Sequence, residues 1–222
     1  MLFGQTAPMI QAILEMRDNE HETKGVLMFG KVIYLYLMSL IFIGCACCTP
    51  SLSESTDTHD NSEYSFATWE TCSQKIGDHP CNFTLKDQND NDVSLYDFYG
   101  DTIVLDFSAM WCGPCRAAAS EVQEVKDSYE SEGLTYLTAL IENSSGKDPS
   151  VGDCKDWADT YGISEPVLAG DRSLLDSTAV NGWPLESWPT FYFITDEMII
   201  NTKLQGYSSS YIDMLIQDTM GL

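Results

Sequence analysis

Two cysteines with two residues between them, Cys112 and Cys115, are the strongest candidates for chemistry in this 222-residue chain. A pair at this spacing can cycle between a dithiol and a disulfide, supply half of a metal site, or form a structural disulfide. Gly113 and Pro114 separate the two cysteines, and Trp111 precedes them. The choice among these roles depends on the elements that position the pair and on the compartment in which the chain resides.

A zinc site is one alternative to a redox pair. Structural zinc needs four ligands, but no second pair at this spacing follows Cys115, and all three histidines precede Cys112. Cys72, His79 and Cys81 are the residues that could contribute further ligands. We therefore expect no metal here, and a metal-binding module of the metallochaperone kind stays open as an alternative function.

The segments around the pair predict a strand followed by a helix. The run TIVLDF, residues 102–107, is typical of a buried strand, and a helix is predicted from about Pro114 to Tyr129. Pro114 suits the first turn of a helix, where its missing N–H has no intrahelical role. Cys112 would then stand where the helix begins, and the dipole and free N–H groups of a helix N-terminus stabilise a thiolate. Trp111 is expected either to shield the pair and offer a docking surface or simply to pack in the core.

Strands and helices alternate along the rest of the folded region. Strands are predicted as a pair around a polar turn within 82–98 and as single runs at 134–141, 166–170, 190–195 and 199–207. Helices are predicted at 151–163, 172–180 and 209–220. This order, with an antiparallel pair and a helix at the end, predicts an α/β fold with a central mixed sheet and helices on both faces.

Two segments resemble the thioredoxin family. VLDFSAMWCGPCR, residues 104–116, is similar to its active-site segment, including the Trp-Cys-Gly-Pro-Cys core. WPTFYFI, residues 188–194, resembles the family's Pro-Thr-apolar strand, whose proline is cis and faces the disulfide. The resemblance covers about residues 81–222. With its longer segment at 142–163 and its N-terminal anchor, the chain resembles the membrane-tethered, TlpA-like thiol–disulfide oxidoreductases of bacteria.

The resemblance implies a thioredoxin-like fold and a role for each site residue. Cys112 attacks a substrate disulfide, Cys115 resolves the mixed disulfide, and Asp106 matches the family's buried acid that exchanges a proton with Cys115. Pro189 should be cis and should shape the substrate groove. Further support for the groove is expected from Trp111, Gly113, Pro114, Trp188 and Thr190. No cofactor is required besides the redox-active disulfide Cys112–Cys115.

The remaining cysteines favour an oxidising compartment, because eight cysteines are many for a cytosolic chain. Cys72 and Cys81 enclose a short loop, and a structural disulfide between them would brace the entry to the domain. Cys154 is left over, so a buried thiol, a pair with Cys47 or Cys48, and a redox role all stay open. Peroxiredoxin chemistry is disfavoured, because the Pro-x-x-x-Thr-x-x-Cys pattern is absent.

The N-terminal region predicts export. Lys31 precedes a mostly apolar run at 32–44, which is too short to span a bilayer comfortably but has the length of a signal-peptide core. The run ends in FIGC, which resembles a bacterial lipobox and implies lipidation of Cys45. Because 30 residues precede Lys31, we expect translation to begin at Met28. The predicted layout is an N-terminal extension with a signal peptide at 1–44, a flexible polar tether at 45–68 and a thioredoxin-like domain at 69–222.

Charge and motifs together predict the partners. With 34 acidic against 11 basic residues and a net charge of -23, the chain would repel the phosphates of nucleic acids. We expect a bacterial cell-envelope lipoprotein, facing the periplasm, that reduces disulfides of exported proteins. Its other partner would be an upstream thiol reductant, such as a membrane electron donor. A disulfide oxidase or isomerase, in which electrons flow the other way, is the alternative.

Overall fold

The computed structural model describes residues 64–179 and 181–222. The predicted signal peptide at 1–44, the start at Met28, the lipidation of Cys45 and most of the tether at 45–68 lie outside the described residues. Within the part of the chain that is described, no helix is both long enough and apolar enough to cross a bilayer.

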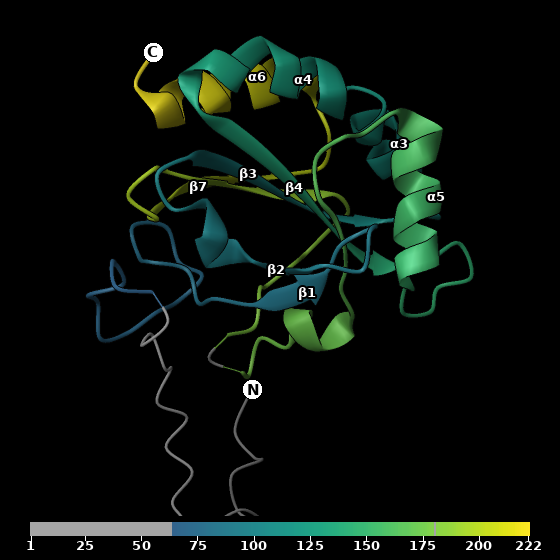
Figure 1. Cartoon of the computed structure of the whole chain (residues 1–222), viewed down its shortest axis with the longest axis horizontal. Helices are drawn as coiled ribbons and strands as arrows, with labels where there is room; N and C mark the ends of the chain where they lie inside the picture. The colour runs from purple at the N-terminus through teal and green to yellow at the C-terminus, as the bar shows by residue number, and fades with distance from the viewer. Residues whose placement is uncertain (1–63, 180) are drawn as a thin grey trace, which may run out of the picture. The chain divides into compact units, whose positions relative to one another are not determined.

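A mixed sheet forms the centre of the described domain (Figure 1). Its strands run in the order β2-β1-β5-β4-β3-β6-β7. β3, β4 and β5 are parallel, and the remaining neighbours pair in antiparallel fashion. The strands are β1 Thr84–Lys86, β2 Asp92–Ser94, β3 Thr102–Ala109, β4 Leu134–Glu142, β5 Val167–Ala169, β6 Thr190–Ile194 and β7 Ile200–Gln205.

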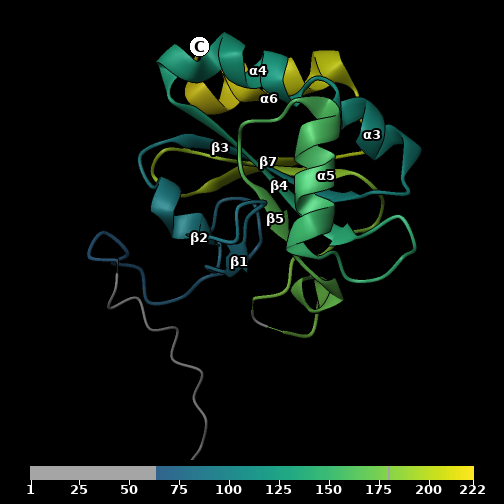
Figure 2. The ribbon, with the colours of Figure 1, turned by 45° about the vertical axis from the view of Figure 1, so that its right-hand side comes forward.

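The α-helices all contribute to one hydrophobic cluster on one face of the sheet (Figure 2). They are α3 Gly113–Ala119, α4 Val122–Tyr129, α5 Val151–Tyr161 and α6 Ser209–Met220. A second hydrophobic cluster lies on the opposite face. It is covered by the entry segment, residues 64–83, and by two short 3-10 helices, η2 Leu95–Phe98 and η4 Arg172–Leu175. A third 3-10 helix, η3 Glu130–Glu132, follows α4. Helices therefore lie on both faces, but the second face carries only short ones.

The two central strands explain why the site lies where it does. Every residue of β3 and β4 is buried, as expected for parallel strands covered on both faces. Their register pairs Thr102 with Leu134 at one end and Ala109 with Glu142 at the other. Because parallel strands end at the same edge of a sheet, the residues after Ala109 and the end of β4 lie side by side.

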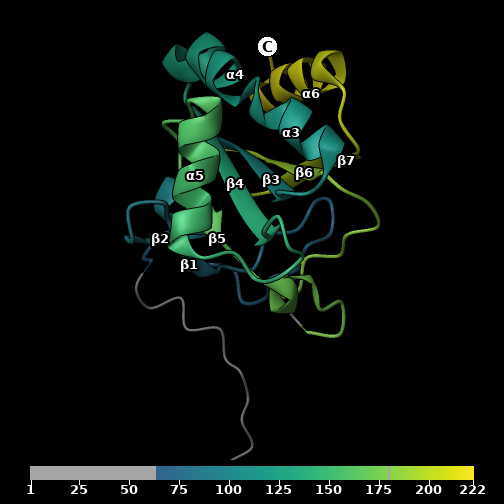
Figure 3. The same ribbon diagram turned by 90° about the vertical axis from the view of Figure 1, so that its right-hand side faces the viewer.

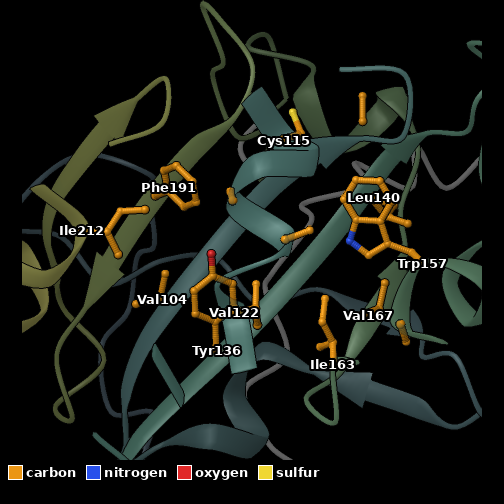
Figure 4. Close-up of a cluster of buried hydrophobic side chains, with 14 of the residues drawn as sticks. Val104, Cys115, Val122, Tyr136, Leu140, Trp157, Ile163, Val167, Phe191 and Ile212 are labelled. Atoms are coloured by element: carbon orange, nitrogen blue, oxygen red, sulfur yellow. The ribbon is translucent and has the colours of Figure 1, made fainter. Parts of the chain in front are cut away.

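The hydrophobic core continues up to the cysteine pair (Figure 4). Cys115 of α3 packs in the same cluster as Val104 of β3, Phe191 of β6 and Ile212 of α6. Trp157 of α5 belongs to this cluster too. The start of α3 thus shares this cluster with β3, β6, α5 and α6, the elements that Figure 3 shows around it.

The predicted helix over 114–129 is divided in two. The Ser120 hydroxyl donates to the carbonyl of Ala117 at 2.7 Å, and Glu121 N–H bonds the carbonyl of Ala118, a 3-10 step, at 2.9 Å. A serine hydroxyl that bonds a nearby backbone carbonyl competes with helical hydrogen bonding. The chain therefore turns at this point before α4 begins.

Two other expectations need correction. The helix predicted at 172–180 is reduced to η4, because the Asp176 carboxylate accepts Thr178 N–H at 2.9 Å and sets a turn. The tether predicted at 45–68 ends earlier than expected. Tyr64 contacts the ring of Tyr96, and Phe66 stacks on Tyr99 at 4.0 Å. Aromatic burial thus brings residues from 64 onward into the packed domain.

Candidate active site

The cysteine pair sits at the junction of β3 and α3, as the sequence predicts. A disulfide joins Cys112 to Cys115. Cys112 is the N-cap of α3, and its Sγ accepts a hydrogen bond from Cys115 N–H at 3.2 Å. Pro114 lies in the first turn. Arg116 holds the preceding loop, because its guanidinium donates to the carbonyls of Met110 and Trp111 at 3.2 and 2.9 Å.

The two cysteines differ slightly in their exposed fraction. Cys115 is 0% exposed, whereas Cys112 retains 4% of its surface. The residues between them, Gly113 and Pro114, are exposed. Both cysteines are buried, and Cys112 is the less enclosed of the two.

The start of β6 lies against the end of β3 next to the pair. Thr190 pairs with Phe107 across the two strands, which brings Pro189 toward the cysteine loop. The Trp188–Pro189 peptide bond is cis, as the resemblance implies. The carbonyl of Pro189 accepts Gly206 N–H at 2.8 Å, and Thr190 Oγ1 donates to the carbonyl of Ser187 at 2.8 Å. The turn at Pro189 is thus held on both sides.

Two tryptophans flank the pair. Trp111 is 45% exposed, so it is not simple core packing. Its ring meets that of Trp188 edge to face, with centroids 6.4 Å apart. Exposed aromatic rings beside a reactive group are suited to holding an extended peptide.

Asp106 lies in β3 below the face that carries α3 and is buried. Burial raises the pKa of its carboxyl to about 7, against an ordinary value of 3.8. The Ser108 hydroxyl donates to Asp106 Oδ1 at 2.8 Å and partly opposes this effect. A carboxyl with this pKa can both take and return a proton at neutral pH.

One site residue was missed by the sequence analysis. Glu142, the last residue of β4, is buried, and its Oε2 accepts the indole N–H of Trp111 at 2.6 Å. Its other oxygen forms an ion pair with Arg172 at the start of η4. A signal was present, because a charged residue at the carboxyl end of a strand parallel to β3 must lie beside the cysteine loop.

The other described cysteines are not bonded to this pair, although Cys154 belongs to the same core cluster. A disulfide joins Cys72 to Cys81 in the entry segment. Cys154 of α5 is a buried free thiol, and burial raises its pKa to about 12, so it is a poor nucleophile at neutral pH. Cys47 and Cys48 lie outside the described residues. Within residues 64–179 and 181–222, no group of three or more His, Cys, Asp or Glu side chains is arranged to hold a metal ion.

Comparisons with known proteins bear on both fold and family. The model of the AhpC/TSA family matches residues 76–203. The thioredoxin-like protein YneN of Bacillus subtilis is 27% identical over 120 residues, which cover 54% of this chain and 65% of YneN. The thiol-disulfide oxidoreductase ResA of the same organism is 28% identical over 146 residues, which cover 64% of this chain and 72% of ResA. This chain thus spans slightly less than two thirds of YneN and slightly more than two thirds of ResA.

Solved structures show the same architecture. The thiol:disulfide interchange protein of the thioredoxin family from Chlorobium tepidum has a TM-score of 0.54 at 19% identity. The match covers 67% of this chain and 100% of that protein. The predicted thioredoxin-like α/β fold is confirmed.

Proposed function

The chain belongs to the AhpC/TSA family, and we propose that it is a thiol–disulfide oxidoreductase that reduces disulfides of exported proteins through Cys112 and Cys115. One observation carries the proposal. The Cys112–Cys115 disulfide lies at the first turn of α3, with Cys112 slightly less enclosed than Cys115, a buried acid in β3 and the cis Pro189 bond at the start of the neighbouring β6. The name of ResA, a thiol-disulfide oxidoreductase, supports the same chemistry.

The reaction transfers two electrons from the dithiol to a substrate disulfide. The Cys112 thiolate attacks one substrate sulfur, the substrate S–S bond breaks, and the released thiolate takes a proton from solvent. Cys115 then gives its proton to Asp106 and attacks the Cys112 sulfur. The second substrate thiolate leaves and is protonated. The substrate is reduced, and the Cys112–Cys115 disulfide remains.

The order of the two cysteines follows from their surroundings. Cys112 is the less enclosed of the two, and Cys115 N–H already points at its sulfur, so the thiolate of Cys112 is stabilised before any substrate arrives. Cys115 is enclosed and needs a base inside the protein. Asp106, with a pKa of about 7, is ionised often enough at neutral pH to serve.

The wider setting extends the proposal. The domain from about residue 69 would work at the cell envelope, exported by the signal peptide at 1–44 and held to the membrane by a lipid on Cys45 through the tether. Its substrates would be disulfide-containing exported proteins. An upstream thiol reductant, such as a membrane electron donor, must return two electrons to Cys112–Cys115 after each turnover. The acidic composition supports the absence of nucleic acid from this list.

A redox titration tests the proposal. The protein is equilibrated in graded glutathione buffers, trapped with an alkylating agent, and scored by peptide mass spectrometry for Cys112–Cys115 separately from Cys72–Cys81. A potential near that of thioredoxin, about −270 mV, is expected for a reductase. A value near about −120 mV would make the protein an oxidant instead. If Cys112–Cys115 never exchanged reversibly, neither direction would hold and the metal-binding alternative would return.

A further inference from the structure

A buried carboxylate beside the disulfide takes no part in the thiol exchange described above. Glu142, at the end of β4, is 4% exposed. Burying a carboxylate costs free energy unless hydrogen bonds and an opposite charge replace the lost water. The partners of Glu142 therefore indicate its role.

Glu142 is attached to the cysteine loop by its backbone and by its side chain. Its carbonyl accepts Met110 N–H at 2.9 Å, and its Oε2 accepts Trp111 Nε1–H at 2.6 Å. One residue thus fixes both residues that precede Cys112. Because hydrogen bonds to a carboxylate are stronger than neutral ones, Trp111 is held in place although much of its ring is exposed.

The second oxygen of Glu142 faces Arg172, the first residue of η4, with which it forms an ion pair. The side chain of Arg172 is 67% exposed and reaches the carboxylate from the solvent side. Asp171 caps η4 by accepting Ser173 N–H at 2.6 Å, which anchors the segment that carries the arginine. An exposed cation of this kind can be replaced without leaving a cavity.

We propose that Glu142 and Arg172 act as positioning residues for the nucleophile: together they fix Trp111 beside the disulfide and balance the charge next to Cys112. The proposal rests on the proposed function, in which Cys112 is the attacking thiolate. It assigns to η4, 60 residues further along the chain, a part in the reactivity of the site.

The sign of the charge effect follows from the groups around Cys112. A negative charge nearby disfavours the thiolate, and a positive charge favours it. Glu142 accepts the indole N–H of Trp111 in the loop and pairs with Arg172 through its other oxygen, while Arg116 of α3 donates to the carbonyls of the same loop. Arg116 also interacts with Tyr161 of α5, and Asp106 is buried in β3. Removing Arg172 leaves the Glu142 charge unbalanced, whereas removing the Glu142 charge leaves Arg172 in excess.

The test measures how fast Cys112 reacts in the reduced full-length protein. Alkylation by iodoacetamide is followed from pH 5 to 9 and scored at Cys112 by peptide mass spectrometry. Arg172→Gln is expected to slow the reaction at pH 7 by about 3- to 10-fold and to move the pH profile upward. Glu142→Gln is expected to speed it by a similar factor and to move the profile downward. Arg172→Lys and the double variant Glu142→Gln/Arg172→Gln should both lie near the wild type.

A second comparison reports on Trp111. Glu142→Gln keeps an oxygen that can accept the indole N–H, whereas Glu142→Ala removes it. Glu142→Ala is therefore expected to raise KM for a protein disulfide by about 3-fold or more relative to Glu142→Gln, as expected when one charge-independent hydrogen bond is lost. Equal KM values in these two variants would contradict the role assigned to Trp111.

The matched control is Lys155→Gln, which breaks the exposed ion pair with Asp159 on α5, and its pH profile should equal that of the wild type. If Arg172→Gln and Glu142→Gln shift the profile in the same direction, or leave it unchanged, the inference is wrong while the proposed function stands. If Cys112 of the wild type shows no thiolate titration and no exchange with disulfides, the proposed function itself fails. Because Arg172 is exposed, its variants decide the matter even if Glu142 variants fold poorly.

Discussion

Cys112–Cys115 and Cys72–Cys81 are the same covalent bond placed in different surroundings. The first spans a sequence separation of 3 at the start of α3, where Cys115 N–H donates to Cys112 Sγ. Cys112 is 4% exposed. The second spans a separation of 9 and closes a loop in the entry segment. Its cysteines occupy no helix N-terminus; Cys81 is fully buried, whereas Cys72 is partly exposed, more so than Cys112.

The loop closed by Cys72–Cys81 is also tied to the rest of the domain. Gly77 N–H donates to the carbonyl of Ile200 at 2.8 Å, and Ile200 N–H donates to the carbonyl of Asp78 at 3.0 Å. The difference between the two disulfides therefore lies in the backbone N–H groups that contact their sulfur atoms. A bond whose sulfur accepts an N–H group in the first turn of a helix is suited to exchange, whereas one that closes a docked loop is suited to bracing.

Loss of the attacking sulfur gives the largest expected difference between the two bonds. Cys112→Ser should abolish reduction of a protein disulfide, by at least about 1000-fold, because no other cysteine of the described residues combines the start of a helix with a resolving cysteine beside it. Turnover is followed with excess dithiothreitol against the uncatalysed rate. The double variant Cys72→Ser/Cys81→Ser should retain most of the activity. Equal losses in the two proteins would remove the distinction between them.

Loss of the resolving sulfur should stall the reaction halfway. Cys115→Ser is expected to accumulate a mixed disulfide between Cys112 and the substrate, because the buried thiol that releases it is gone. Peptide mass spectrometry after mixing with an oxidised peptide should show the adduct on Cys112. No adduct should form on Cys72 or Cys81, and adducts there would show that the second bond exchanges as well.

Asp106→Asn should separate the bonds through pH. Wild-type turnover is expected to rise as pH passes about 7, where Asp106 becomes able to take the Cys115 proton. The variant should lose this rise and run slower by on the order of 100-fold above it. Reoxidation of Cys72–Cys81 should have the same pH profile in the wild type and in the variant, because Asp106 takes no part in it.

The same substitution has a consequence for stability. The native protein holds the Asp106 proton up to about pH 7, whereas an unfolded chain releases it near 3.8. Between these values the native state binds more protons, so the free energy of unfolding falls as pH rises. Asp106→Asn should therefore stabilise the fold at pH 8, by roughly 4 kcal/mol at most, and leave it nearly unchanged at pH 4. Denaturant unfolding at the two pH values measures this, and equal gains at both would argue against a buried proton.

The smallest expected effect concerns the bracing bond. Cys72→Ser/Cys81→Ser should lower the free energy of unfolding by about 2 to 3 kcal/mol, because the unfolded chain gains the conformational entropy of an open loop of this length. Urea unfolding with Cys112–Cys115 kept oxidised provides the comparison. An unchanged midpoint would mean that the contacts of the loop with β7 suffice without the disulfide.

Local sequence patterns were enough to predict much of the site. The apolar run of β3, the proline in the first turn of α3 and the spacing of Cys112 and Cys115 are all contained within a few neighbouring residues. The cis bond at Pro189 and the buried acid Asp106 came from the resemblance to thioredoxins. These are features that short segments carry by themselves.

What was missed depends on contacts between distant segments. Glu142 becomes part of the site only through the register of β4 against β3, and Arg172 only through the path of the chain after β5. Tyr64 and Phe66 looked like the end of a polar tether, because their partners Tyr96 and Tyr99 come over 30 residues later. The break between α3 and α4 arises from one serine hydroxyl, which helix periodicity does not reveal.

The docking of the entry loop onto β7 also sets an order of events during folding. His79 Nδ1 meets the carbonyl of Met198 at 2.7 Å, and Gly77 pairs with Ile200, across separations of about 120 residues. The ribosome makes the loop early and its docking strand late, and such distant contacts are slow to form. The loop between Cys72 and Cys81 can thus close early. It can dock on β7 only after nearly the whole domain has been synthesised.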